Sequence, residues 1–176
     1  MVQQVLNNTA IADIESTVTN ADVALVFVSA FAVEGQDREN LLLNANGDAI
    51  INATASNNNN TILIMHIPGT VDIEQWKNHP NITAILAPLL PGEQAGPSLV
   101  SVLYGDVSPS GKLPFTIGKS EADFPPNTIV SDPVVAPKSY FTEKLEIDYR
   151  WLDAHDITPT YGTPLYSAPS AYVRTY

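Results

Sequence analysis

Short apolar segments alternate with amphipathic segments along residues 10–104. The apolar segments are rich in β-branched residues and have the length of buried strands; they occupy residues 22–28, 61–66 and 82–87. Helical patterns occupy residues 10–19, 46–55, 71–77 and 93–104. This alternation predicts βαβ units, in which helices connect parallel strands and cover both faces of one sheet.

Proline and glycine positions refine these elements. Pro97 falls near the first turn of the last helix, where its missing N–H costs little, and Gly105 is expected to end that helix in a left-handed conformation. A further strand is predicted at residues 113–117, at the edge of the sheet because Pro114 cannot donate to a ladder. The face of the last helix that we expect to point inward consists of Leu99, Val100 and Leu103.

The predicted fold class is α/β: a three-layer α/β/α sandwich with a mostly parallel sheet of about five or six strands. We assign it to one domain, residues 1–160, followed by a tail rich in proline and tyrosine at residues 161–176. Within the last part of the domain, residues 141–152 form an ordered island, in which Tyr149 and Trp151 are expected to hold the chain against the sheet.

Composition excludes several classes of protein. The formal net charge is −11, which repels polyanions, so we expect no nucleic-acid partner. No apolar run approaches the roughly 20 residues of a spanning helix, so no membrane association is expected. Cysteine is absent and the three histidines show no ligand spacing, so the sequence predicts neither a metal site nor a cofactor.

Polar side chains follow the first two predicted strands. Glu34, Asp37 and Arg38 come after the first strand, and His66 ends the second. In open parallel sheets, ligands bind at the carboxyl ends of the strands. These residues are therefore the candidates for a ligand site, although a loop glutamate paired with Arg38 and a structural His66 are the plain alternatives.

Several uncommon sequence motifs, in order, resemble the second domain of glycoside hydrolase family 3, the β-glucosidases. The loop after the first strand matches the family at Glu34-Gly35 and at Asp37-Arg38. The resemblance runs from about residue 20 to about residue 159 and includes the segments at 61–66, 76–86, 90–96, 99–116 and 141–150. It implies a carbohydrate partner, with Glu34 as the catalytic acid/base and Asp37, Arg38 and His66 as substrate-binding residues.

The same resemblance implies that the catalytic machinery is incomplete. Retaining hydrolysis needs a second carboxyl group as nucleophile. In the family this aspartate belongs to a preceding (β/α)₈ barrel, and no segment here resembles a barrel. The family's tyrosine after Glu-Gly is Gln36 here, and its Gly-Gln-Glu is Gly92-Glu93-Gln94. We therefore expect a domain that contributes the acid/base side of a β-glucosidase site and is inactive alone.

A reading from another class stays open: a non-catalytic descendant that binds glycans like a lectin, or that self-associates. A homodimer would be formed through the tail, whose tyrosines are Tyr161, Tyr166, Tyr172 and Tyr176. The resemblance favours a secreted, extracellular glycoprotein, although the chain begins without a leader pattern. Sequons for N-linked glycosylation occur at Asn7, Asn52, Asn59 and Asn81.

Overall fold

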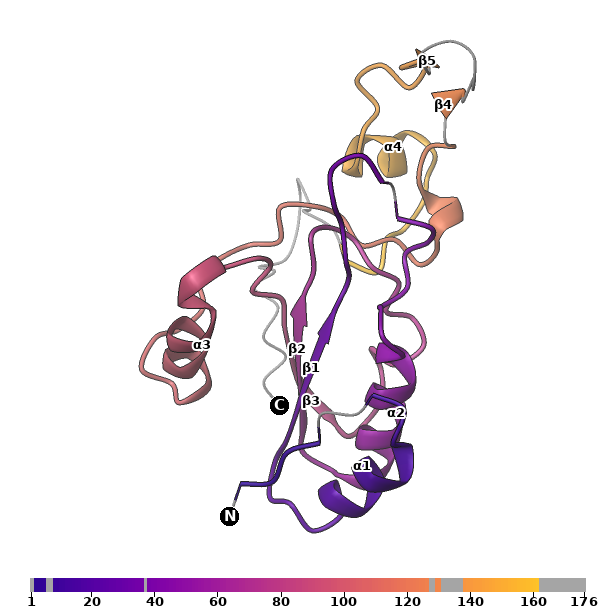
Figure 1. Ribbon diagram of the computed structural model, residues 1–176. Helices are drawn as coiled ribbons and strands as arrows, with labels where there is room; N and C mark the ends of the chain where they lie inside the picture. The colour runs from indigo at the N-terminus through magenta and orange to yellow at the C-terminus, as the bar shows by residue number, and fades with distance from the viewer. Residues whose placement is uncertain (1, 6–7, 37, 127–128, 131–137, 162–176) are drawn as a thin grey trace.

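The centre of the protein is a parallel sheet of three strands. The computed structural model describes residues 2–5, 8–36, 38–126, 129–130 and 138–161. Its strands are β1 (Ala24–Ser29), β2 (Thr61–His66) and β3 (Ile82–Leu86), in the order β1-β2-β3 (Figure 1). Val26 pairs with Leu63, and Leu63 with Ile85. All three strands lie where the apolar segments predict them, and their parallel arrangement is confirmed.

Two helices cover one face of this sheet. Helices α1 (Ile11–Val18) and α2 (Gly47–Asn57) lie on the same side, and α3 (Ala95–Leu103) lies on the other (Figure 1). The even-numbered residues of β1 point toward α2 and are buried, so this face is the core. Its most buried members include Val26, Val28, Ile51, Ala55, Leu63, Met65, Ile73, Trp76 and Ile85.

The opposite face of β1 is open to solvent in the part of the chain that the structure describes. Leu25 is 46% and Phe27 57% exposed. Among the described residues β1 pairs with β2 alone, so it is an edge strand of the sheet that they form. The predicted sheet of five or six strands is therefore not seen: the described residues form three parallel strands and a separate antiparallel pair, β4 (Ile129–Val130) and β5 (Lys138–Ser139).

Residues 71–77 were predicted to be helical, and this prediction is wrong. Residues 71–73 are irregular and residues 74–77 form a turn, and Val71, Ile73 and Trp76 are all nearly completely buried. The indole Nε1 of Trp76 donates to Asp48 Oδ1 of α2 over 2.7 Å. One face of a helix could not bury Val71, Ile73 and Trp76 together. The burial of these three side chains therefore outweighs the weak helical propensity of the segment.

The last predicted helix is present, although its first turn is tighter. A 3₁₀ turn, η1 (Gly92–Gln94), leads into α3 (Ala95–Leu103), and Pro97 lies in the first turn of α3. Gly105 follows the C-cap residue with φ +80°, the left-handed conformation that was predicted. Val100 is 51% exposed, so its assignment to an inward face is wrong.

Residues 113–117 do not form the predicted edge strand. Only Ile117 pairs, in an isolated antiparallel bridge with Tyr161, through N–H···O distances of 2.6 and 3.0 Å. The backbone N–H of Thr116 instead donates to Asp148 Oδ1 over 2.8 Å. Pro114 cannot donate to a neighbouring strand, and at Thr116 the carboxylate of Asp148 accepts the hydrogen bond in place of such a strand.

The ordered island forms around a short helix, α4 (Tyr149–Ala154), which comes after the 3₁₀ turn η2 (Glu121–Asp123). Leu152 is buried, and the ring of Trp151 stacks on His155 with a centroid distance of 3.8 Å. Tyr149 is half-buried. The tail tyrosines Tyr166, Tyr172 and Tyr176 lie outside the described residues, whereas Tyr161 packs against the core.

Candidate functional site

The polar residues predicted to form a site lie on loops at one edge of the sheet. β1 and β2 run parallel and end in register, with Ser29 opposite His66. The loop after β1 carries Glu34 and Arg38, and the loop after β2 carries Thr70. The topology therefore brings these segments to the carboxyl edge of the sheet, as expected for a ligand site in an open α/β fold.

Glu34 lies at the tip of a tight turn. Val33 and Gln36 form an antiparallel bridge around it, and Gly35 has φ +82°, which corresponds to the third position of a type II turn. The side chain of Glu34 is exposed. It makes no hydrogen bond or ion pair with any described residue, so the alternative of a Glu34–Arg38 pair finds no support there.

Arg38 is anchored on one side and free on the other. Its Nη1 donates to the carbonyl oxygen of Thr70 over 2.7 Å, whereas its Nη2 is buried without a partner among the described residues. Burial lowers the pKa of Arg38 from its ordinary value, and the nearby charge of Glu121 opposes this effect. Buried donors are usually paired, so the Nη2 group of Arg38 is a donor that lacks its acceptor in the described part of the chain.

His66 faces the end of the third strand rather than the Glu34 loop. Its Nδ1 lies 3.3 Å from the carbonyl oxygen of Leu89, a residue held at φ +58°. With Nδ1 as the donor of this hydrogen bond, Nε2 is left as an acceptor. His66 therefore combines a structural contact with a ring nitrogen that has no hydrogen bond to any described residue, and the two interpretations of this residue are compatible.

No hydrogen bond or ion pair joins Glu34, Arg38 and His66 in the described part of the chain, and Asp37 lies outside the described residues. The sequence interpretation missed the two carbonyl groups that hold the site, those of Thr70 and Leu89. Backbone acceptors carry no signal in the sequence. It also missed Asn44, whose Oδ1 accepts from the Phe31 N–H and whose N–H donates to Ser29 O over 2.9 Å, fixing the start of the loop.

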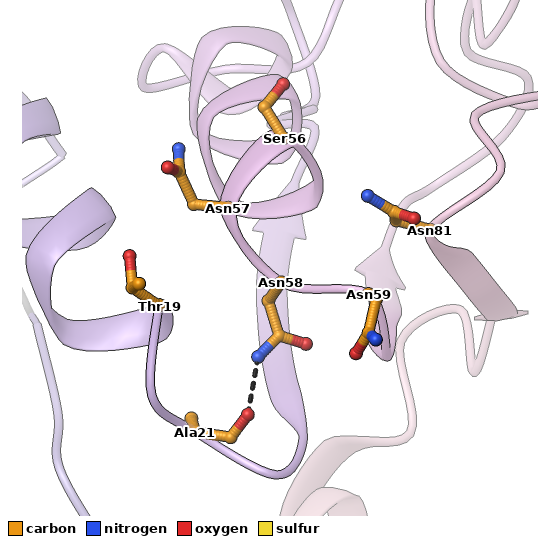
Figure 2. Close-up of a pocket in the computed structure, with 7 residues that line it drawn as sticks. All are labelled: Thr19, Ala21, Ser56, Asn57, Asn58, Asn59 and Asn81. Carbon is orange, nitrogen blue, oxygen red and sulfur yellow. Dashed lines mark hydrogen bonds between the residues drawn. The ribbon is translucent and has the colours of Figure 1, made fainter.

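Two pockets lie away from these residues. One is largely apolar and is formed by residues after β3, by α3 and by residues 109–114. The other has a volume of about 330 Å³ at the opposite end of the sheet, where α1 and α2 end (Figure 2). Its lining is polar and consists of Thr19, Ala21, Ser56, Asn57, Asn58, Asn59 and Asn81.

The described residues show neither a metal-ligand group nor a membrane-spanning helix. They contain no group of three or more histidine, cysteine, aspartate or glutamate residues placed to hold a metal ion. None of the helices in the described ranges is long and apolar enough to cross a membrane.

A parallel sheet with helices, and with polar loops at its carboxyl edge, defines an α/β domain of the kind that binds ligands at strand ends. The family model described as "Glycosyl hydrolase family 3 C-terminal domain" matches residues 1–149. The chain belongs to this family, and the resemblance noted in the sequence is confirmed.

Curated relatives with similar sequences are fungal β-glucosidases. The chain is 46% identical over 168 residues to "Probable beta-glucosidase G" of Aspergillus flavus. The matched region covers 92% of this chain and 20% of the relative. It is 41% identical over 170 residues to "Beta-glucosidase 1" of Aspergillus aculeatus, with 91% and 20% covered. The chain therefore spans about a fifth of the length of these relatives.

Solved structures show the same fold. A glycoside hydrolase family 3 β-glucosidase of Neurospora crassa matches with a TM-score of 0.83 and 37% identity over 91% of this chain and 20% of that chain. The β-glucosidase DesR of Streptomyces venezuelae, solved in complex with D-glucose, matches with a TM-score of 0.73 and 28% identity over 88% and 20%.

Proposed function

We propose that this chain contributes the acid/base side of a β-glucosidase site, with Glu34 as the proton donor to the leaving group. Asp37, Arg38 and His66 are the sugar-binding residues in this proposal. The observation that carries it is the buried, unpartnered Nη2 of Arg38 at the carboxyl edge of the sheet. A glucoside hydroxyl or ring oxygen supplies the acceptor that this nitrogen lacks.

The position of Glu34 supports its role as a proton donor. The type II turn places its carboxyl group at the loop tip, exposed and without a partner among the described residues. A catalytic acid must be able to reach the glycosidic oxygen of a bound substrate, and a side chain tied into an ion pair is less able to do so. The relatives named as β-glucosidases support the choice of substrate class.

We propose that the chain alone does not hydrolyse β-glucosides. Retaining hydrolysis requires two carboxyl groups about 5 to 5.5 Å apart, and the sequence offers no segment that resembles the barrel that carries the second one in the family. The chain spans about a fifth of its relatives' length, so a barrel domain that carries the nucleophile is the proposed partner. A secreted, extracellular location belongs to the same proposal.

Turnover and binding are tested separately. The purified chain is assayed with an aryl β-glucoside, and we expect no turnover above background. Turnover at a typical enzymatic rate of about 1 to 10³ per second that Glu34→Gln abolishes would contradict the missing-nucleophile argument. The matched control is Glu39→Gln, which changes an exposed glutamate on the same loop.

Glucose binding is followed by NMR titration of backbone amides. We expect shifts at residues 34–38 and 66–70 that Arg38→Gln abolishes and Glu39→Gln preserves. Shifts confined to the asparagine-lined pocket would instead support the lectin-like alternative. The exposed Leu25 and Phe27 of β1 favour the alternative of self-association, which light scattering tests.

A further inference from the structure

Two of the four N-glycosylation sequons meet at one pocket. Asn59 lies between α2 and β2, Asn81 precedes β3, and both line the polar pocket of Figure 2. Asn52 lies within α2, and Asn7 lies outside the described residues. The structure allows the asparagines around this pocket to be compared one by one.

Asn58 serves the fold. It is 5% exposed, and its Nδ2 donates to Val18 O over 2.9 Å. The same Nδ2 donates to Ala21 O over 2.7 Å, the bond drawn in Figure 2. Its Oδ1 accepts from the backbone N–H of Asn60 over 2.9 Å. This one amide therefore ties the end of α1 to the turn that leads into β2.

The other neighbouring asparagines also have structural partners. Asn60 Oδ1 accepts from Thr83 Oγ1 over 2.9 Å. Asn57 Nδ2 donates to Ala53 O over 2.9 Å, and Asn81 Nδ2 donates to Ala55 O over 2.7 Å. Each of these amides satisfies a backbone carbonyl or a hydroxyl group of the fold.

Asn59 is the exception. Its side chain is exposed and makes no hydrogen bond with any described residue, although it lies between two asparagines that do. It follows Asn58, which ends α2 in an extended conformation, and it precedes the buried Thr61 of its own sequon. No contact of the described fold depends on the side chain of Asn59, so the sequon Asn59-Asn60-Thr61 is the one feature here that needs an asparagine.

The remaining described sequons fit a glycan less well. Asn81 is half-buried, and its Nδ2, the atom to which a sugar would be attached, already donates to Ala55 O. Asn52 is half-buried in the middle of α2. Asn59 alone among the described sequons combines an exposed side chain with a free amide nitrogen outside a helix.

We propose that Asn59 carries an N-linked glycan whose first sugar lies at the mouth of the asparagine-lined pocket. In the transfer, Nδ2 of Asn59 forms a bond to the anomeric carbon of a lipid-diphosphate-linked oligosaccharide. The bond from that carbon to the diphosphate oxygen breaks, the lipid diphosphate leaves with its electron pair, and Nδ2 loses one proton. The inference rests on the proposed secretory location.

The test removes that dependence. The full chain is expressed in a eukaryotic host behind a secretion signal, digested, and treated with peptide N-glycosidase in heavy-oxygen water. We expect the peptide that contains Asn59 to show conversion of that residue to labelled aspartate. An unconverted Asn59 peptide from the secreted protein overturns the proposal, and so does conversion of Asn81 without Asn59.

Matched variants separate modification from folding. Asn59→Gln is expected to lose the mass of one glycan with little change in the midpoint of thermal unfolding measured after deglycosylation. Asn60→Gln leaves the sequon of Asn59 intact, so it keeps the glycan but loses the hydrogen bond from Thr83. Equal electrophoretic masses for the wild type and Asn59→Gln would contradict the proposal.

Discussion

Arg38 Nη1 donates a hydrogen bond to the carbonyl oxygen of Thr70 over 2.7 Å, and this contact joins the loop after β1 to the loop after β2. One guanidinium therefore joins the two loops through Nη1 and keeps Nη2 buried without a partner among the described residues.

Replacing Arg38 is expected to affect ligand binding and stability together. Arg38→Lys keeps the charge but loses the planar fork, so glucose affinity should fall at least tenfold while the fold is retained. Arg38→Ala leaves the Thr70 carbonyl without its partner, and the free energy of unfolding should fall by about 1 to 3 kcal/mol. NMR titration and urea denaturation measure the two effects. Lys112→Ala, at an exposed cation, should change neither; equal effects at both sites would show that only net charge matters.

The contact between Trp76 and Asp48 is expected to stabilise the core. Trp76 is 1% exposed, and Asp48→Ala leaves its indole N–H without an acceptor. A buried, unpaired donor costs about 1 to 3 kcal/mol, so the urea midpoint should fall accordingly. Asp106→Ala, which removes an exposed loop carboxylate, is the matched control. Identical midpoints for the two variants would show that the hydrogen bond contributes nothing.

Stability should depend on pH through Glu74. Partial burial alone would raise the pKa of Glu74, but hydrogen bonds from Lys77 and Thr160 outweigh it and lower the pKa below its ordinary value. The unfolded chain therefore binds the proton more tightly, so the contribution of Glu74 is present above a pH of about 4.3 and is lost as the pH falls through the folded pKa.

The expected size is at most about 1 kcal/mol, because Glu74 and Lys77 are partly solvated. Urea denaturation of the wild type and of Glu74→Gln at several pH values measures it. The difference between them should be largest near neutral pH and vanish in acid. A difference that grows as the pH falls would reverse the assigned sign.

Self-association is expected through β1. The Ala24 N–H donates to Asn60 O and the Ala30 N–H to His66 O. The backbone amides of even-numbered residues therefore point toward β2, and those of Leu25 and Phe27 point toward the open edge. Two copies related by a two-fold axis can pair these strands antiparallel, with Leu25 opposite the partner's Phe27. The net charge of −11 opposes this, but at 0.15 M salt screening acts over about 8 Å.

Light scattering at high micromolar concentration should show a dimer that Leu25→Lys dissociates. Val100→Lys, on the exposed side of α3, is the matched control and should leave the dimer intact. A chain that ends at Thr160 tests whether the tail contributes to the dimer as well. A monomer for the full chain excludes self-association, and a dimer unaffected by Leu25→Lys excludes the β1 edge.

The sequence predicts those elements whose local pattern and tertiary surroundings agree. β2 was predicted at its observed limits because its apolar run directly follows the four asparagines at residues 57–60, which are typical of a turn. Gly105 was predicted correctly because the left-handed end of a helix is a local requirement. In both cases the information lies within a few residues.

Predictions failed where distant contacts decide the conformation. Residues 71–77 do not form a helix because Trp76 reaches Asp48 and the core, and Thr116 bonds to Asp148, 32 residues away, instead of joining a strand. The site follows the same rule. Strand ends indicate where Arg38 and His66 lie, but not that the carbonyl groups of Thr70 and Leu89 orient them.

The two tryptophans lie in different surroundings, which makes them separate optical reporters. Trp76 is enclosed by the core of the parallel sheet, whereas Trp151 belongs to α4 and stacks on His155. The emission of Trp151→Phe therefore follows the sheet alone, and that of Trp76→Phe follows α4. Comparing the two transitions shows whether the region of α4 unfolds together with the sheet or as an independent cooperative unit.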